Sequence, residues 1–218
     1  MNAVRNYQKE LDKIIEKTGA AEGCAPTLFL HSCCAPCSSY VLEYLRQYFR
    51  ITVFYYNPNI TEDEEYRKRV TEQKRLIAAY NETMAEQEML TEQKRTGYHI
   101  EIVEGDYEPE RFFEMAKGLE ACPEGGERCF ACYALRLRET AKRARAGNYD
   151  YFTTTLSISP LKNAAKLNEI GEKLAVEYGV VWLPSDFKKK DGYRRSIELS
   201  REYNLYRQNY CGCVYSKD

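Results

Sequence analysis

The stretch Thr27-Leu28-Phe29-Leu30-His31-Ser32-Cys33-Cys34-Ala35-Pro36-Cys37 decides the architecture of this chain. Its apolar start predicts a short buried strand over 27–30, and the cysteine turn after it leads into a helix that continues through Leu45. Pro36 suits the first position of that helix, because proline has no N–H to donate and its φ is already helical. Adjacent strand residues point to opposite faces, so Cys33 and Cys34 share a site only if the turn has begun.

Strand-like and helix-like segments alternate along the rest of the chain. We expect strands at 27–30, 51–56, 99–103, 151–156 and 180–183, and helices at 1–17, 36–45, 61–94 (with a candidate break near Asn81), 112–119, 129–145 and 161–178. The alternation predicts an α/β fold, a Rossmann-like parallel sheet with helices on both faces. We expect a single α/β domain over 1–218, with an acidic helical insertion at roughly 61–97.

Ligands of such sheets bind at the carboxyl ends of the strands. The cysteine turn follows the first expected strand, and the run Thr153-Thr154-Thr155 ends the fourth. Both segments therefore mark the expected active site.

The composition narrows the class of protein. Of 218 residues, 44% are apolar and 30% charged, which is typical of a globular protein. No apolar run approaches the roughly 18 residues of a membrane helix, and no signal-peptide pattern is present, so we expect a cytoplasmic protein without a membrane partner. The net charge of −1 excludes a globally basic nucleic-acid binder.

The charges are nevertheless uneven. Residues 61–110 hold 14 acidic and 7 basic side chains, and the rest of the chain carries a net charge of +6. Two basic stretches could face a polyanion. They are Arg136, Arg138, Lys142, Arg143 and Arg145 on one expected helix, and Lys188, Lys189, Lys190, Arg194 and Arg195 around an expected turn.

Nine cysteines and only two histidines point to a site built from thiolates. Cys33 and Cys34 with the pair Cys129-Phe130-Ala131-Cys132 offer four thiolates, enough for an iron–sulfur cluster or a structural zinc. The missing spacer between Cys33 and Cys34 suits one tetrahedral zinc poorly and favours a [4Fe–4S] cluster. Cys34-Ala35-Pro36-Cys37 also fits a thioredoxin-like redox turn.

Cys211-Gly212-Cys213 forms a third group near the C-terminus. A disulfide across one residue closes a small, strained ring that is easily reduced, and glycine supplies the backbone freedom that the ring needs. The alternative is two free surface thiols. Cys24 and Cys122 belong to none of these groups.

Six motifs in consistent order resemble the QueH family of epoxyqueuosine reductases. They span roughly 27–216: His31-Ser32-Cys33-Cys34-Ala35-Pro36-Cys37, Phe54-Tyr55-Tyr56-Asn57-Pro58-Asn59-Ile60, Gly118-Leu119-Glu120, Arg128-Cys129-Phe130-Ala131-Cys132, Phe152-Thr153-Thr154-Thr155-Leu156-Ser157-Ile158-Ser159-Pro160 and Tyr210-Cys211-Gly212-Cys213-Val214-Tyr215-Ser216.

The resemblance implies a fold similar to nucleotide α-hydrolase and PP-loop domains. It implies an iron–sulfur oxidoreductase, independent of cobalamin, that reduces the epoxide of epoxyqueuosine in tRNA in the last step of queuosine biosynthesis. By the same resemblance Cys33, Cys34, Cys129 and Cys132 hold a [4Fe–4S] cluster, Cys211 and Cys213 form a redox-active disulfide, and a second, mononuclear iron lies beside the cluster.

Further expectations concern individual roles. Cys37, at a helix N-terminus that lowers thiol pKa values, would be functional and could ligate the second metal. Asp106, after the third strand, is a candidate proton donor or metal ligand. The partners would be tRNAs with queuosine-family anticodons, bound through the two basic stretches, and an unidentified electron donor. Two alternatives remain: a zinc-stabilised RNA-binding module without redox chemistry, and a thiol–disulfide oxidoreductase.

Overall fold

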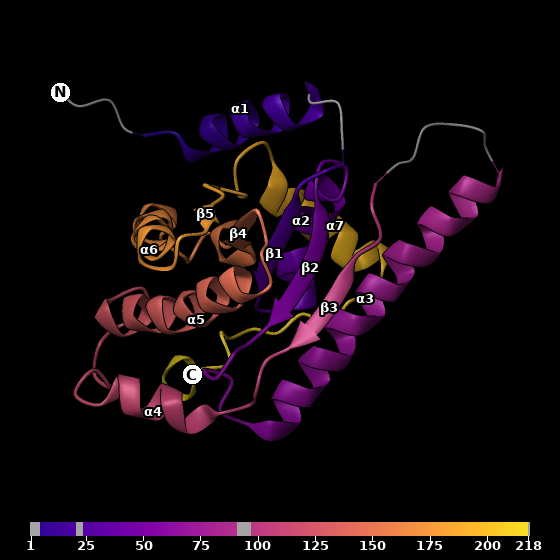
Figure 1. The fold of residues 1–218 in the computed structure, drawn as a ribbon. Coiled ribbons are helices and arrows are strands. Elements are labelled where there is room, and N and C mark those ends of the chain that lie inside the picture. Colours follow the sequence, from indigo (N-terminus) through magenta and orange to yellow (C-terminus); the bar gives the residue numbers. More distant parts are fainter. Residues whose placement is uncertain (1–4, 21–23, 91–96, 218) are drawn as a thin grey trace.

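A computed structural model describes residues 5–20, 24–90 and 97–217 and shows one parallel sheet between two layers of helices (Figure 1). The five strands run in the order β3-β2-β1-β4-β5. The strands are β1 (Thr27–Ser32), β2 (Arg50–Tyr55), β3 (Glu101–Glu104), β4 (Tyr151–Thr154) and β5 (Val181–Trp182). The α-helices are α1 (Tyr7–Ala20), α2 (Ala35–Leu45), α3 (Asp63–Leu90), α4 (Pro109–Ala116), α5 (Glu127–Ala146), α6 (Ala164–Tyr178) and α7 (Gly192–Glu202). Two short 3-10 helices, η1 (Thr155–Ile158) and η2 (Val214–Ser216), follow β4 and the last cysteines.

Alternation along the strands builds a separate core on each face of the sheet. Leu28 and Leu30 of β1 pack with α1, α2 and α3, whereas Phe29 between them packs with α5 and α6. The same change of side occurs in β2 between Val53 and Phe54. Both faces of the expected parallel sheet are therefore covered by helices, which confirms the predicted fold class.

The order of the strands places a switch point between β1 and β4. From β1 the chain moves outward through β2 to β3, and it then returns through α4 and α5 to pair β4 with the other side of β1. His31 of β1 lies beside Thr154 of β4 in the register. Ligands of open α/β sheets bind in the crevice at such a switch point, beyond the carboxyl ends of the strands.

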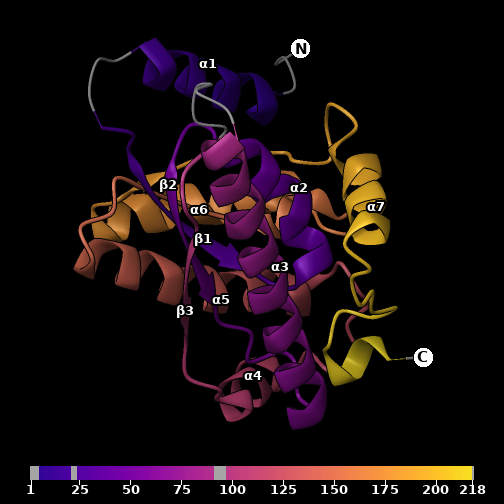
Figure 2. The ribbon, with the colours of Figure 1, turned by 90° about the vertical axis from the view of Figure 1, so that its right-hand side faces the viewer.

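The acidic stretch forms α3, which is the crossover from β2 to β3 and runs along the length of the molecule in Figure 2. The helix continues through Asn81, where a break had been expected. The Asn81 amide bonds the backbone N–H and the carbonyl of Ile100, both at 3.0 Å, so its polarity is used by the strand segment beside it. Residues 91–94 of the expected helix lie outside the described residues, as do residues 1–4 of the first one.

The C-terminal part contains a helix that the sequence did not predict. Helix α7 replaces the expected turn, and it packs against α2. Gly192 begins it in close contact, since a Cβ there would lie 2.5 Å from Tyr40 and 2.0 Å from the carbonyl oxygen of Phe187. No helix in the described residues is long and apolar enough to cross a membrane.

Candidate active site

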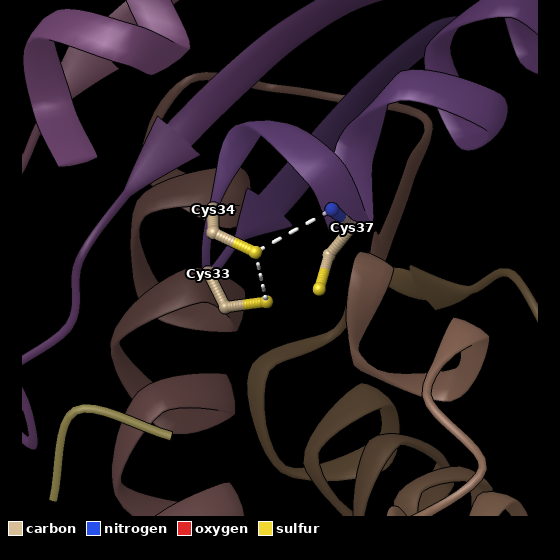
Figure 3. Close-up of side chains that lie close together, drawn as sticks. All are labelled: Cys33, Cys34 and Cys37. Carbon is tan, nitrogen blue, oxygen red and sulfur yellow. Dashed lines mark hydrogen bonds between the residues drawn. The ribbon is translucent and has the colours of Figure 1, made fainter. Parts of the chain in front are cut away.

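The cysteine turn brings three thiols together directly after β1. The sulfurs of Cys33, Cys34 and Cys37 lie within 4.8 Å of one another, and Figure 3 shows them pointing toward a common centre. Cys34 is the N-cap residue of α2, and its Sγ accepts a hydrogen bond from the backbone N–H of Cys37 at 3.4 Å. The turn has therefore begun at Cys33, which allows adjacent cysteines to converge. We call these three residues the thiol triad.

The three thiols of the triad differ in the direction of their pKa shifts. Hydrogen bonding with Cys34 and Cys37 lowers the pKa of Cys33 well below its ordinary value. Burial raises the pKa of Cys34, and hydrogen bonds with its two neighbours raise that of Cys37. The pKa of Cys37 is therefore raised rather than lowered as expected for a helix N-terminus, because its hydrogen bonds with Cys33 and Cys34 outweigh that effect.

Two buried side chains fix this turn. His31 lies between Thr154 Oγ1 (2.8 Å from Nδ1) and the Tyr56 carbonyl (3.1 Å from Nε2). A carbonyl only accepts, so Nε2 carries the hydrogen, and burial lowers the pKa of His31 to about 3 and keeps it neutral. On α3, the Gln73 carbonyl oxygen accepts hydrogen bonds from Ser32 (2.8 Å) and Ser38 (3.0 Å), one at each end of the cysteine turn.

A second group of thiols surrounds a small cavity of about 20 Å³. Cys129 and Cys132, from the first turns of α5, line this smaller cavity together with Cys211 and Cys213. Burial raises the pKa of Cys132 to about 11 and also raises that of Cys213. All nine cysteines are free thiols in this structure, so the predicted disulfide between Cys211 and Cys213 stays a prediction.

A larger cavity of about 390 Å³ is lined by thiols of both groups. Cys33 and Cys37 line the larger cavity, and Cys211 lines both cavities. Among the described residues, the triad alone brings three ligating atoms within 4.8 Å. The predicted set of four ligands is thus divided: Cys33 and Cys34 lie with Cys37, and Cys129 and Cys132 lie with the C-terminal pair.

Arg136 places a buried positive charge among these thiols. Its side chain is 1% exposed, with Nε bonded to the Cys132 carbonyl (3.3 Å) and Nη1 to Asn57 (3.4 Å). Burial alone would lower its pKa, but Cys132, Cys211 and Cys33 outweigh that effect and raise it. Nη2 is buried and has no hydrogen-bond partner in the described part of the chain. The expectation that Arg136 contacts RNA is wrong, because its guanidinium does not reach the surface.

A second buried arginine holds the Cys211-Gly212-Cys213 loop. Arg69 of α3 is 2% exposed, and its Nη1 donates to the Cys211 carbonyl at 3.1 Å while Nε pairs with Glu65 at 2.7 Å. Gly212 has φ +100, and a Cβ on it would lie 2.8 Å from Ile60. The loop is therefore packed against α3 and the segment between β2 and α3, in a conformation that requires glycine.

Lys162 and Glu124 stand where the two cavities meet. The Lys162 ammonium donates to Glu124 Oε1 at 3.0 Å and to Cys211 Sγ at 3.5 Å. No motif pointed to Arg69, Gln73 or Lys162. Each is an isolated polar residue in sequence, and only the fold brings it to the cysteines.

Asp106 lies apart from this arrangement. Its side chain is 78% exposed and pairs with Arg143 at 3.1 Å, and it lines neither cavity. Its expected role as proton donor or metal ligand stays a prediction. Cys24 and Cys122 likewise line neither cavity.

Most of the expected RNA-binding residues are already paired with carboxylates. Arg138 pairs with Glu177, and Arg143 with Glu139. Near α7 the corresponding pairs are Lys188 with Asp186, Lys190 with Asp12, Arg194 with Asp191 and Glu198, and Arg195 with Glu43.

Comparison with known proteins agrees with the motifs. The family model described as epoxyqueuosine reductase QueH matches residues 28–218, which include the triad and both later cysteine pairs. The chain belongs to the QueH family. Proteins named epoxyqueuosine reductase QueH share 45% identity over 213 residues in Staphylococcus epidermidis (97% of this chain, 84% of the other) and 42% over 213 residues in Staphylococcus aureus (97% and 83%). The QueH protein of Thermotoga maritima is 32% identical over 190 residues, which cover 87% of this chain and 90% of the other.

Proposed function

We propose that this QueH protein reduces the epoxide of epoxyqueuosine in tRNA to the alkene of queuosine. The observation that carries the proposal is the convergence of the family's cysteine motifs on two adjoining cavities at the switch point of the sheet. The larger cavity, about 390 Å³, has room for one modified nucleobase, and enzymes that act on a base take it out of the stack. Its tRNA substrate places the proposed reaction in the cytoplasm.

Conversion of an epoxide to an alkene takes two electrons and two protons and releases one water. We assign the electrons and the protons to the Cys211–Cys213 dithiol, so that one epoxide and two thiols give one alkene, one disulfide and one water. Cys211 lines both cavities and Cys213 only the smaller one, so the pair extends from the substrate side inward. A separate electron donor must then reduce the disulfide before the next turnover.

We further propose that Cys33, Cys34, Cys129 and Cys132 hold a [4Fe–4S] cluster and that Cys37 contributes to a second iron. An all-thiolate donor set suits iron–sulfur clusters and zinc. The unpartnered Nη2 of Arg136 supports an anionic group here, because a buried guanidinium needs compensating negative charge. When bound, such a cluster supplies single electrons, and an iron beside it supplies a Lewis acid.

One observation favours zinc as the second candidate. The Cys33 and Cys34 sulfurs are 3.9 Å apart, close to the edge of about 3.8 Å in a tetrahedron with 2.3 Å bonds. The absence of a spacer between Cys33 and Cys34 therefore does not prevent both sulfurs from binding one tetrahedral zinc. A zinc-bound triad without redox chemistry would leave the C-terminal pair without a function.

Anaerobic purification followed by iron, zinc and sulfide analysis distinguishes the iron–sulfur cluster from the zinc site. We expect about five irons for every four sulfides, a brown protein, and loss of one oxygen atom from the modified nucleoside when reduced protein meets an epoxyqueuosine-containing anticodon stem-loop. Cys129→Ala should lose sulfide and activity, whereas Cys24→Ser should keep both, because Cys24 is exposed and outside the site. Stoichiometric zinc without sulfide, or normal sulfide in Cys129→Ala, would refute the cluster assignment.

The disulfide is tested separately. Cys211 and Cys213 should resist alkylation after oxidation and accept two alkyl groups after reduction, as measured by mass spectrometry of the C-terminal peptide. Two free thiols under oxidising conditions would remove the dithiol as the electron source.

A further inference from the structure

Lys162 is one of three residues that line both cavities, together with Glu124 and Cys211. These three side chains therefore form the wall between the larger, substrate-sized cavity and the smaller one that holds Cys213, Cys129 and Cys132. A side chain in this wall can contact both a substrate in the larger cavity and the proposed electron source, the dithiol of Cys211 and Cys213.

The local fold fixes Lys162 in this wall. It follows the Ser159-Pro160 turn after η1, and its backbone N–H donates to the Ser159 carbonyl at 3.1 Å. Asn163, the next residue, is the N-cap of α6. The side chain is 8% exposed, so its position is set by packing rather than by solvent.

The charge state of Lys162 is also fixed. Burial alone would lower its pKa, but Cys211, Tyr133 and Glu124 outweigh burial and raise the pKa above its ordinary value. The ion pair with the Glu124 carboxylate at 3.0 Å therefore supports a protonated amine. An ammonium has three N–H donors, and within the described residues two are used, one by Glu124 and one by Cys211.

A cation at this place suits the proposed reaction. When a C–O bond of an epoxide breaks, its electron pair stays on oxygen, and that oxygen leaves as water only after it is stabilised and protonated. We propose that the Lys162 ammonium binds the epoxide oxygen through its third N–H, an inference that rests on the proposed function. The dithiol of Cys211 and Cys213 supplies the electrons and both protons, so Lys162 stabilises charge and is not consumed.

Binding measurements test the contact without requiring turnover. Oxidised, metal-loaded protein is titrated with two anticodon stem-loops, one carrying epoxyqueuosine and one carrying queuosine, which lacks the oxygen. The wild type should prefer the epoxide by about tenfold, because a hydrogen bond from a charged donor is lost with the alkene. Lys162→Met should bind both RNAs equally, and Lys162→Arg should keep part of the preference.

Two further variants serve as controls. Lys173→Met removes an exposed, ion-paired lysine on α6 and should keep the full preference. The double variant Lys162→Met with Glu124→Gln leaves no unpaired carboxylate between the two cavities, so it reports the loss of the ammonium even if the single variant folds poorly. In a single turnover with reduced protein, the Lys162→Met rate should fall by roughly 100-fold, as for loss of one oxyanion donor.

The outcomes are distinguishable. An equal preference in the wild type and the Lys162 variants overturns the inference, as does a wild type without preference that still reduces the epoxide. If Lys162→Met were alkylated more slowly at Cys211 but kept the RNA preference of the wild type, Lys162 would act on the thiol alone. This result would also overturn the inference. A wild type that neither binds the epoxide RNA above unmodified RNA nor reduces it contradicts the proposed function, and the inference falls with it.

Discussion

Arg136 follows Cys132 by four residues on α5, and this spacing places its guanidinium beside the thiols rather than on the surface. A charge run on a helix predicts a solvated face, and for Lys142 and Arg145 that prediction agrees with their exposure. Arg136 differs because it lies on the same side of the helix as Cys129 and Cys132. A buried charge without compensation costs several kcal/mol, so this arginine and the thiolates depend on each other.

Replacing Arg136 tests that dependence. Arg136→Met should lose more than half of its bound iron and sulfide after desalting, because the thiolates no longer face a cation. The matched control is Arg138→Met, which removes a half-exposed arginine two positions along α5. Equal metal content in both variants would contradict the electrostatic role of Arg136.

Cys37 lies within the triad, so its substitution should affect metal binding selectively. Cys37→Ser should keep the sulfide content, lose about one iron per chain and lose activity, because Cys33 and Cys34 remain for the cluster. Metal and sulfide analysis with Cys122→Ser as control measures this. Full iron and full activity in Cys37→Ser would show that the third thiol of the turn is dispensable.

At the scale of the elements, α3 is part of the site. Three polar residues on one side of it, the partly buried Glu65 and the buried Arg69 and Gln73, are spaced four apart and so lie one above another. Arg69 holds the Cys211 loop and Gln73 holds the cysteine turn. The helix that looked like an acidic insertion therefore aligns the two cysteine-containing segments with each other.

This alignment predicts a large difference between two neighbouring arginines. Arg69→Leu should lower the free energy of unfolding by about 3 kcal/mol, because it leaves the partly buried Glu65 carboxylate and the loop carbonyls without their partner. Arg67→Leu removes an exposed pair with Asp63 and should leave the free energy of unfolding nearly unchanged. Urea denaturation of both variants provides the measurement, and similar costs would refute the role given to Arg69.

Glu72 connects α3 to the C-terminal segment through hydrogen bonds whose strength depends on pH. Its carboxylate accepts hydrogen bonds from Arg75 and from the Tyr206 backbone N–H (2.6 Å), and Arg75 chiefly lowers its pKa. The unfolded chain then binds a proton at a higher pH than the folded chain, so this stabilisation is complete at neutral pH and is lost as the pH falls below the usual glutamate value of about 4.3.

Glu72→Gln should therefore be less stable than the wild type by about 1 kcal/mol at pH 7, and the difference should shrink toward zero by pH 3. Unfolding curves across that range, with exposed Glu62→Gln as a comparison, measure the effect. A gap that stays constant with pH would show that the Glu72 charge contributes nothing.

At the scale of the whole molecule, the cavity mouth limits where RNA can bind. Tyr193 and Ser196 of α7 line the larger cavity, so the basic residues around the start of α7 adjoin its opening. The basic end of α5 is elsewhere: Arg145 lies about 20 Å along the helix from Cys132, toward the start of β4. Of the two expected RNA surfaces, the geometry favours the one at α7.

Two double substitutions compare these surfaces. Lys189→Glu with Arg194→Glu should weaken anticodon stem-loop binding at least tenfold and flatten its dependence on salt, because phosphate contacts are lost. Lys142→Glu with Arg145→Glu should change binding less than twofold. Neither pair should alter the metal content. Stronger loss from the α5 pair would reverse the assignment.

Much of this protein could be predicted from local sequence. The alternation of strands and helices, the turn at Cys33 and Cys34 and the family motifs depend on neighbouring residues, so they are readable without a fold. The α/β class was confirmed for this reason, and residues after β1 and β4 line the larger cavity. Helix α7 was missed because its start depends on contact between Gly192 and α2, which lies about 150 residues earlier in the chain.

The sequence by itself determined the parallel sheet, the thiol chemistry and the edge of the sheet at which it gathers, because hydrophobic period and motif spacing are local properties. Only the tertiary structure decided how the thiols are grouped, with Cys37 beside Cys33 and Cys34 and with Cys211 between two cavities. It also decided that Arg136 and Lys162 are buried while Asp106 is exposed. These outcomes depend on which distant segments meet, since burial and charge pairing are properties of packed surfaces rather than of residue types.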